Sequence, residues 1–344
     1  MNLITKHERP GVYSSYEASA LSAAAGKGKA VAVVAAGPAD KEGTVYSWTS
    51  YSRAMNDVGQ CQLSELARLA LKNGAGLVYG VVAGDNYEAA FGLVETIEDA
   101  AVVVCDSTDL TIQQKLRDMV ESCSAVRKER IAVVGGAAGE PVSALLERAE
   151  GLNCERVVLV APGGAAGEGG ITCAAAVAGA IAANTDPALP LGGVRLYGLE
   201  GLETTYEDGD IDLLVQGGVT PLEMLAGGCY VVRGVTTRTT TGGVPDATWR
   251  ELTTILVVDE VIPGIRSALR AKFARAKNTE QTRGAIRSQV VMELEDRVSR
   301  EIIDSYEDVT AEPLDSDPTV CLVEFAFTVA HGLNQIWLSA HITV

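Results

Sequence analysis

The chain has 344 residues and a formal net charge of −17 at pH 7. Hydrophobic residues make up 47% of it, which is enough to bury the core of one large or two ordinary domains. An acidic surplus of this size repels a phosphate backbone, so direct nucleic-acid binding is not expected.

Neither the apolar runs nor the first residues indicate a membrane or a secretory pathway. The longest apolar runs, 30–36 and 174–183, are shorter than the about 18 to 20 residues that a membrane-spanning helix needs. Residues 1–8 lack the apolar segment of a secretory signal. The seven cysteines include no C-x-x-C pair and mostly have apolar neighbours, which favours buried, reduced thiols. We therefore expect a protein without membrane insertion that stays in the cytoplasm where it is made.

From residue 29 onward the sequence predicts strands alternating with helices. Four of five strand candidates are nearly continuous runs of Val, Ile, Leu and Ala, as in parallel strands buried on both faces. This order predicts an α/β fold with a mainly parallel sheet and flanking helices. The strand candidates are 29–35, 76–83, 100–105, 130–134 and 156–160, and the helix candidates are 61–72, 87–94, 111–122, 141–150 and 171–183.

The alternation breaks at 187–193, and a C-terminal α+β domain is predicted to follow. Strands are expected at 194–197 and 252–258, and two helices with apolar faces at 262–273 and 286–302. The acidic, proline-containing segment 307–318 is expected to be a loop. We therefore divide the chain into an N-terminal arm (1–28), an α/β domain (29–245), a C-terminal α+β domain (246–333) and a C-terminal arm strand (334–344).

The final ten residues have the alternating pattern of a β-strand. Ile336, Leu338, Ala340, Ile342 and Val344 would share one face. Residues 321–329 alternate in the same way, and the turn residues 331–334 between the two runs indicate a hairpin. Because chain ends normally fray, this pattern also predicts a partner strand, which can belong to another molecule.

Positive charge is concentrated in the two predicted C-terminal helices. Residues 262–300 contain nine basic and four acidic residues, so this segment carries +5 and the rest of the chain −22. Amphipathic helices with solvated basic faces are the simplest explanation. The alternative is a basic face containing Arg266, Arg270 and Arg275 that docks on an acidic face of a neighbouring subunit. This alternative predicts salt-sensitive self-association.

The sequence contains none of the motifs expected of a nucleotide-binding protein or a hydrolase. Its glycine-rich turns do not fit the dinucleotide fingerprint, and no G-x-x-x-x-G-K-[ST] is present. The three histidines, His7, His331 and His341, lie outside the α/β region, so a Ser-His-Asp triad has no base there. We predict no catalytic residues, no cofactor and no metal site, and the sequence argues against an enzyme.

One acidic segment, 105–109, follows a predicted strand at a place where open α/β sheets often carry acidic ligands or phosphoacceptors. A receiver-like site would also need acidic residues after the first strand and a lysine after the fifth. The chain has AAGP and APG at these places. We therefore interpret Ser107, Thr108 or Asp109 as the cap of the following helix.

Several segments resemble a known family in the order in which they occur. Residues 177–186 (VAGAIAANTD) are similar to an A-G-x-x-A-x-x-D stretch, and 190–194 (PLGGV) to the family's next segment. Residues 212–219 (DLLVQGGV) and 228–237 (GCYVVRGVTT) match later steps, and 9–13 (RPGVY) is typical of the N-terminus. These segments resemble the contractile tail sheath proteins of bacteriophages and phage-tail-like particles. The chain is short for that family, and YVV at 230–232 replaces a more usual tryptophan-containing strand.

The resemblance implies a structural protein whose α/β domain has a subtilisin-like fold without catalysis. Subunits of such a sheath form six-fold rings stacked helically around an inner tube, and terminal arms add strands to a sheet in neighbouring subunits. Contraction, triggered by the baseplate, drives the tube through a cell envelope. The implied partners are further copies, the tail tube protein, and baseplate and terminator proteins. The implied location is a virion or phage-tail-like particle, assembled in the bacterial cytoplasm.

The same resemblance assigns residues to the arms. Val12, Tyr13 and Tyr16 would lie in the N-terminal arm strand, and Ile336, Leu338, Ile342 and Val344 in the C-terminal one. Segments 18–29 and 331–334 would be the flexible joints.

Two other interpretations remain open. One is a nucleotide-binding or hydrolytic α/β enzyme built on the parallel sheet. The other is a monomer in which 336–344 pairs only with 320–329 as a self-contained hairpin. The sequence does not distinguish a phage from a DNA-free particle.

Overall fold

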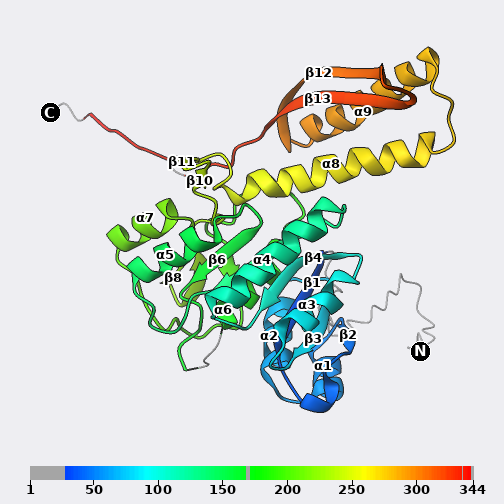
Figure 1. Ribbon diagram of the computed structural model, residues 1–344. Helices are drawn as coiled ribbons and strands as arrows, with labels where there is room; N and C mark the ends of the chain where they lie inside the picture. Colours follow the sequence, from blue (N-terminus) through cyan, green and yellow to red (C-terminus); the bar gives the residue numbers. More distant parts are fainter. Residues whose placement is uncertain (1–27, 168–170, 335, 342–344) are drawn as a thin grey trace, which may run out of the picture.

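The computed structural model describes residues 28–167, 171–334 and 336–341. Within these ranges a nine-stranded sheet forms the centre of an α/β body (Figure 1), in the order β2-β3-β1-β4-β5-β6-β8-β9-β7. The six strands β3, β1, β4, β5, β6 and β8 pair in parallel. The other three strands, β2, β9 and β7, pair in antiparallel. The strands are β1 (Ala30–Ala36), β2 (Val45–Trp48), β3 (Leu77–Ala83), β4 (Ala100–Cys105), β5 (Ile131–Gly135), β6 (Val157–Ala161), β7 (Arg195–Leu196), β8 (Val219–Leu225) and β9 (Gly228–Val231).

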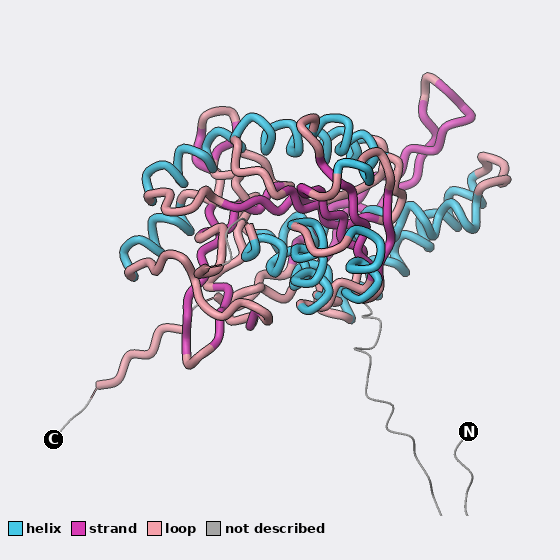
Figure 2. The backbone as a smooth tube through the Cα atoms, turned by 90° about the horizontal axis from the view of Figure 1, so that it is seen from below, coloured by secondary structure: helices cyan, strands magenta, loops and turns pink. Residues whose placement is uncertain are grey.

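Helices cover both faces of the sheet, which Figure 2 shows as strands running through the middle of the body. One apolar core lies under α1, α2 and α6, and the second under α3, α4, α5 and α7. The mainly parallel α/β prediction is confirmed, and the five predicted strands begin and end within one residue of the observed ones. The helices are α1 (Tyr51–Val58), α2 (Gln62–Lys72), α3 (Tyr87–Glu95), α4 (Leu110–Ala125), α5 (Val142–Leu152), α6 (Thr172–Ala183) and α7 (Asp208–Gln216).

Helix α6 is buried on every side, because it lies between the sheet and α2. Its residues are almost all small, and Gly179 is the point of closest approach. A Cβ atom at Gly179 would lie 2.4 Å from the carbonyl oxygen of Ala70 in α2, so only glycine fits there.

A second unit follows the body and consists of α8 (Leu252–Phe273), α9 (Glu280–Ser299), β12 (Ile303–Leu314) and β13 (Asp317–Val329). The two strands form an antiparallel hairpin over the helices (Figure 1), with an apolar core of its own. We call these two strands the β12–β13 hairpin. A short ribbon, β10 (Thr240–Thr241) with β11 (Val244–Pro245), precedes α8.

Two sequence predictions in this unit are wrong. The predicted strand 252–258 is the first part of α8. A short apolar run fits a buried helix segment as well as a strand, and here the run packs in the body's core. The predicted loop 307–318 is most of β12 and the start of β13, whose solvent-facing acidic residues hide the strand pattern.

The predicted hairpin between 321–329 and 335–344 is also wrong for the described residues, because β13 pairs with β12 instead. Residues 336–341 form no strand in this chain and leave the body as an extended segment (Figures 1 and 2). Ile336 and Leu338 are 80% and 93% exposed. The self-contained hairpin is therefore not observed, whereas a strand completed by another molecule remains a prediction. The division of the chain into two arms and two domains also remains a prediction.

Candidate assembly surfaces

The carboxyl ends of the parallel strands are where an open α/β sheet would carry a ligand site. Asp106, after β4, accepts hydrogen bonds from Tyr87 Oη at 2.6 Å and from the Ala36 amide at 2.8 Å. Burial, followed by the bond to Asp106, raises the pKa of Tyr87, and burial raises the pKa of the Cys105 thiol. Asp106 is therefore engaged in joining two loops.

Other polar groups at this edge are likewise engaged within the protein. Asp109 accepts a hydrogen bond from the Thr111 amide at 2.7 Å, which confirms it as the cap of α4 and lowers its pKa. The Gln113 side chain donates to the carbonyl of Gly135 at 2.9 Å, and Arg148 pairs with Glu140 at 3.0 Å. No group of three or more potential metal ligands occurs among the residues that the structure describes. The polar groups at this edge connect the loops and helix ends of the body to one another.

The joint between the body and α8 lies at the opposite edge, where the parallel strands begin. Arg156, before β6, makes two hydrogen bonds to Asp259 of α8, at 2.8 and 2.9 Å, and both side chains are largely buried. Burial raises the pKa of Asp259 even though Arg156 favours its charged form. The pair fixes the second unit to the body.

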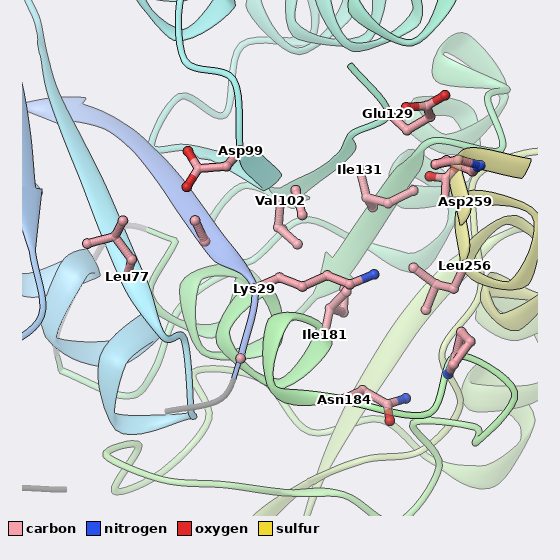
Figure 3. A pocket seen from close by; sticks show the side chains of 15 residues that line it. Lys29, Leu77, Asp99, Val102, Glu129, Ile131, Ile181, Asn184, Leu256 and Asp259 are labelled. Carbon is pink, nitrogen blue, oxygen red and sulfur yellow. The ribbon is translucent and has the colours of Figure 1, made fainter. Parts of the chain in front are cut away.

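A cavity of about 450 Å³ opens beside this joint. Figure 3 shows Lys29 reaching from the start of β1 between Ile181 and Leu256, with Glu129 and Asp259 at the far side. Because both carboxylates already pair with arginines of this chain, the cavity belongs to the joint.

The structure separates the three arginines of the predicted basic face. Arg266 pairs with Glu129 of the same chain at 2.9 Å. Arg270 and Arg275 lie near the end of α8 that projects beyond the body in Figure 1, are exposed, and make no ion pair within the described part of the chain. Arg266 therefore belongs to the joint, whereas Arg270 and Arg275 are available to a partner.

The β12–β13 hairpin is covered on one face only. Its inner side chains pack on α8 and α9 in the third apolar core, and its outer face is exposed. Apolar residues lie among the polar residues of that outer face, and one of them, Leu322, is 44% exposed. Among the described residues neither strand has a second partner, so each has a free edge. The sequence showed the alternation of 321–329 but not that β12 is its partner.

The C-terminal segment leaves the hairpin along residues 331–334, which pack against the body. Gly332 lies against Pro190, since a Cβ atom there would be 2.7 Å from the proline Cδ. Leu333 and Asn334 line a cavity with Arg233 and Arg250 of the body. The predicted joint at 331–334 is thus packed against the body at its root.

Of the predicted arm residues, the structure describes two. Ile336 and Leu338 are exposed on the extended segment. The others, Val12, Tyr13, Tyr16, Ile342 and Val344, lie outside the described residues.

Two family models match successive parts of the chain. Residues 80–237 match the phage tail sheath protein central domain, and residues 244–343 match the phage tail sheath C-terminal domain. The chain belongs to the phage tail sheath protein family. The resemblance drawn from the sequence is confirmed, and the family is one of structural proteins.

One curated sheath relative and several solved structures agree with this assignment. The tail sheath protein of Bacillus phage SP01 is 26% identical over 253 residues, covering 71% of this chain and 43% of the relative. The chain thus spans less than half the length of that sheath protein.

Among the residues that the structure describes, none of the helices combines the length and the apolar character that a membrane span requires.

The similar structures share the fold over nearly the whole chain. The helical sheath of the anti-feeding prophage in its contracted state is 15% identical with a TM-score of 0.73, covering 98% of this chain and 99% of that one. A chain of the six-fold symmetrised baseplate of the same prophage is 13% identical with a TM-score of 0.73, covering 98% and 100%. The sheath tail protein of Desulfitobacterium hafniense is 12% identical with a TM-score of 0.67, covering 93% and 100%. At these identities the likeness shows the fold alone.

Proposed function

We propose that this sheath-family chain is a structural subunit of a contractile tail sheath. It polymerises as stacked hexameric rings around an inner tube through strand exchange of terminal arms. Contraction of this lattice drives the tube through a cell envelope. The observation that carries the proposal is the coexistence of an exposed segment at 336–341 with a two-stranded hairpin whose edges have no partner among the residues that the structure describes.

Strand exchange follows from the physical chemistry of these two features. Fully burying a side chain such as Ile336 or Leu338 contributes about 1.5–3 kcal/mol, and each added main-chain hydrogen bond contributes about 0.5–1.5 kcal/mol. An extended segment and an unpaired strand edge satisfy both terms when they meet. Because main-chain pairing fixes register while the bodies remain separate, subunits can move without leaving the polymer.

The body serves as a rigid, non-catalytic block in this proposal. Polar groups at the carboxyl ends of its strands bond to one another, as Asp106 and Tyr87 do. No cofactor is needed, and a chain of −17 net charge is not suited to bind nucleic acid directly.

The proposed partners are further copies of this chain, the tail tube protein, and baseplate and terminator proteins. Support for self-assembly and for a baseplate comes from the anti-feeding prophage, whose helical sheath and six-fold symmetrised baseplate contain similar chains. The proposed location is a virion or phage-tail-like particle, assembled in the host cytoplasm and without membrane insertion.

Arg270 and Arg275 are the proposed residues of an electrostatic contact between subunits. They lie on a segment of +5 in a chain that carries −22 elsewhere, so an acidic face of a neighbouring copy is a suitable partner. Arg266 has an intramolecular partner in Glu129 and is proposed to contribute less directly.

Deleting 336–344 tests the proposal. We expect the truncated chain to keep its melting temperature, because the described part of this segment contributes no strand to the fold, and to lose the ability to form tubes in electron microscopy. A full-length variant with Ile336→Asp and Leu338→Asp should behave in the same way.

Ser339→Asp is the matched control, because this residue lies on the opposite face of the predicted strand and should be tolerated. Normal tubes from the truncated chain would contradict strand exchange. A large fall in melting temperature would instead indicate that the segment belongs to the fold of its own subunit.

A further inference from the structure

We infer that the cavity lined by Arg233 and Arg250 is a binding site for a small oxyanion, either a phosphate or a carboxylate. The cavity has a volume of about 470 Å³, which is within the range of small-molecule sites. It lies between α7, the segment that follows β9, the residues before α8 and the segment that follows β13. The site takes no part in strand exchange, so it is independent of the proposed function.

Arg250 is the first reason for this assignment, because its charge has no partner. Its side chain makes no hydrogen bond or ion pair within the part of the chain that the structure describes, and its Nε atom is buried. Withdrawing a charged group from water is unfavourable unless another polar group replaces the water. Arg148 and Arg156, by contrast, have carboxylate partners in their own chain. An anion in the cavity would give Arg250 the same kind of partner.

Arg233 supplies further donors to the same cavity. Its Nη2 atom donates to Glu251, and its buried Nε atom has no partner among the described residues. A guanidinium group carries several N–H donors in a planar fork, so one carboxylate does not exhaust them. Oxyanions bind most strongly where such forks can donate in pairs. Arg233 and Arg250 together therefore favour an oxyanion over a monatomic anion such as chloride.

Backbone hydrogen bonds hold the two arginine-bearing segments side by side. The Thr236 amide donates to the carbonyl of Arg250 at 2.8 Å, and the Leu252 amide donates to the carbonyl of Gly234 at 3.4 Å. The main-chain positions of both arginines are thus set by the fold before any ligand binds. Less conformational entropy is lost on binding when a site is ordered in advance.

The remaining lining residues are compatible with a single small anion. Asp212 of α7 is the one carboxylate among the residues that line the cavity, and it is exposed and paired with neither arginine. Since Glu251 balances the charge of Arg233, the charge of Arg250 is left for a ligand. The side-chain amide of Gln216 offers a neutral donor, and Val232 provides an apolar wall that strengthens nearby hydrogen bonds.

The site also reaches the root of the C-terminal segment. Leu333 and Asn334 are exposed and form part of the cavity lining, and the Asn334 amide can donate to an oxyanion. An anion that joins this amide to the arginines would restrict the movement of residues 331–334. Occupancy of the site is therefore expected to steady the point at which the exposed segment 336–341 leaves the body.

Binding is tested on the full-length chain, held below its assembly concentration, with phosphate and with malonate as separate probes. Sodium chloride at the same ionic strength controls for screening. With either probe in several-fold excess over its Kd, we expect the melting temperature to exceed that in chloride by about 2 °C or more. Isothermal titration calorimetry gives the Kd values, and the lower of the two shows whether the site prefers a phosphate or a carboxylate.

Variants separate the site from general effects of salt. Arg250→Ala should raise the Kd by about tenfold or more, because charge-assisted hydrogen bonds are lost. Arg250→Lys keeps the charge but not the fork, so an intermediate Kd is expected. Arg270→Ala is the matched control: it removes the same charge from an exposed position on α8 and should leave the Kd within about twofold. Stabilisation by anions excluded from the protein surface acts on every variant alike.

Two results would overturn the site itself. One is a wild-type chain that responds to phosphate and malonate no more than to chloride. The other is an Arg250→Ala chain that folds, as circular dichroism shows, and binds both anions as tightly as Arg270→Ala does.

Hydrogen exchange followed by mass spectrometry tests the link to the C-terminal segment. Exchange within 331–334 should slow when the preferred anion binds to the wild-type chain and should not change for Arg250→Ala. Saturable binding at Arg250 with unchanged exchange in 331–334 would overturn the effect on the segment and leave the site standing.

Discussion

The α/β body and the β12–β13 hairpin bury their strands in opposite ways. Body strands such as β5 and β6 are buried on both faces, and they lie between paired neighbours in the sheet. β13 alternates between half-buried and exposed residues, and neither edge of the hairpin has a partner within the described part of the chain. The central strands of the body are therefore paired and covered within one chain, whereas the hairpin still has apolar surface and main-chain groups to satisfy.

This difference indicates how a subunit can be both rigid and joined to its neighbours. Folding energy is concentrated in the body, where the two layers of helices close both faces of the sheet. The hairpin and the exposed segment keep apolar surface and main-chain groups that can contribute free energy to assembly. Changes in the two regions should therefore affect different measurements, namely the free energy of unfolding and the extent of polymerisation.

The largest effect on stability is expected at the joint between the two regions. Asp259→Ala leaves Arg156 buried without its partner, which should lower the free energy of unfolding by about 3–5 kcal/mol. Urea unfolding of the purified chain measures this loss, and a separate early transition would show that the C-terminal unit has come apart from the body.

Glu260→Ala is the control for the joint, because its partner Arg300 is 3.9 Å away and both side chains are partly exposed. Its effect should stay within about 0–1 kcal/mol. The double variant Arg156→Met with Asp259→Leu should recover most of the loss, since an apolar pair leaves no buried charge. Equal effects of Asp259→Ala and Glu260→Ala would contradict the assigned role of the buried pair.

A second pair of substitutions compares a buried residue of the body with an exposed residue of the hairpin. Leu159 in β6 is fully buried, so Leu159→Ala should lower the free energy of unfolding by about 2–5 kcal/mol. Leu322 lies on the open face of β13, so Leu322→Ala should cost less than about 1 kcal/mol in the isolated subunit. Chemical unfolding below the assembly concentration measures both. A Leu322→Ala loss as large as that of Leu159→Ala would show that the hairpin's outer face is already buried.

The contrast between the regions also explains what the sequence could predict. The five parallel strands β1, β3, β4, β5 and β6 were located within one residue, because burial on both faces produces nearly continuous apolar runs, as in β4 and β6. β12 was missed because only Ile303, Val309 and Ala311 are buried, and two bulges shift them out of a simple two-residue period.

Pairings between distant segments could not be predicted from local patterns. The pattern of 321–329 was recognised, but its partner was wrongly taken to be the next alternating run along the chain. Arg266 and Glu129 are 137 residues apart, so only the fold could show that this arginine has a partner while Arg270 and Arg275 have none in the described chain. The alternation of the C-terminal residues was recognised because it does not depend on the rest of the fold, but their role as an arm strand stays a prediction.

The smallest effect on the subunit itself is expected at the exposed end of α8. Arg270→Glu with Arg275→Glu changes two exposed side chains, so the free energy of unfolding should change by no more than about 0.5 kcal/mol. If these residues meet an acidic face of a neighbour, polymerisation followed by sedimentation should fall sharply at low salt. The difference from wild type should shrink as salt rises, because charges are screened beyond about 10 Å at 0.1 M ionic strength.

Arg266→Glu is the contrasting variant: it faces Glu129 with a like charge, so it should reduce stability as well as assembly. Assembly and contraction unchanged by Arg270→Glu and Arg275→Glu at every ionic strength would remove the electrostatic contact and leave strand exchange as the connection between subunits.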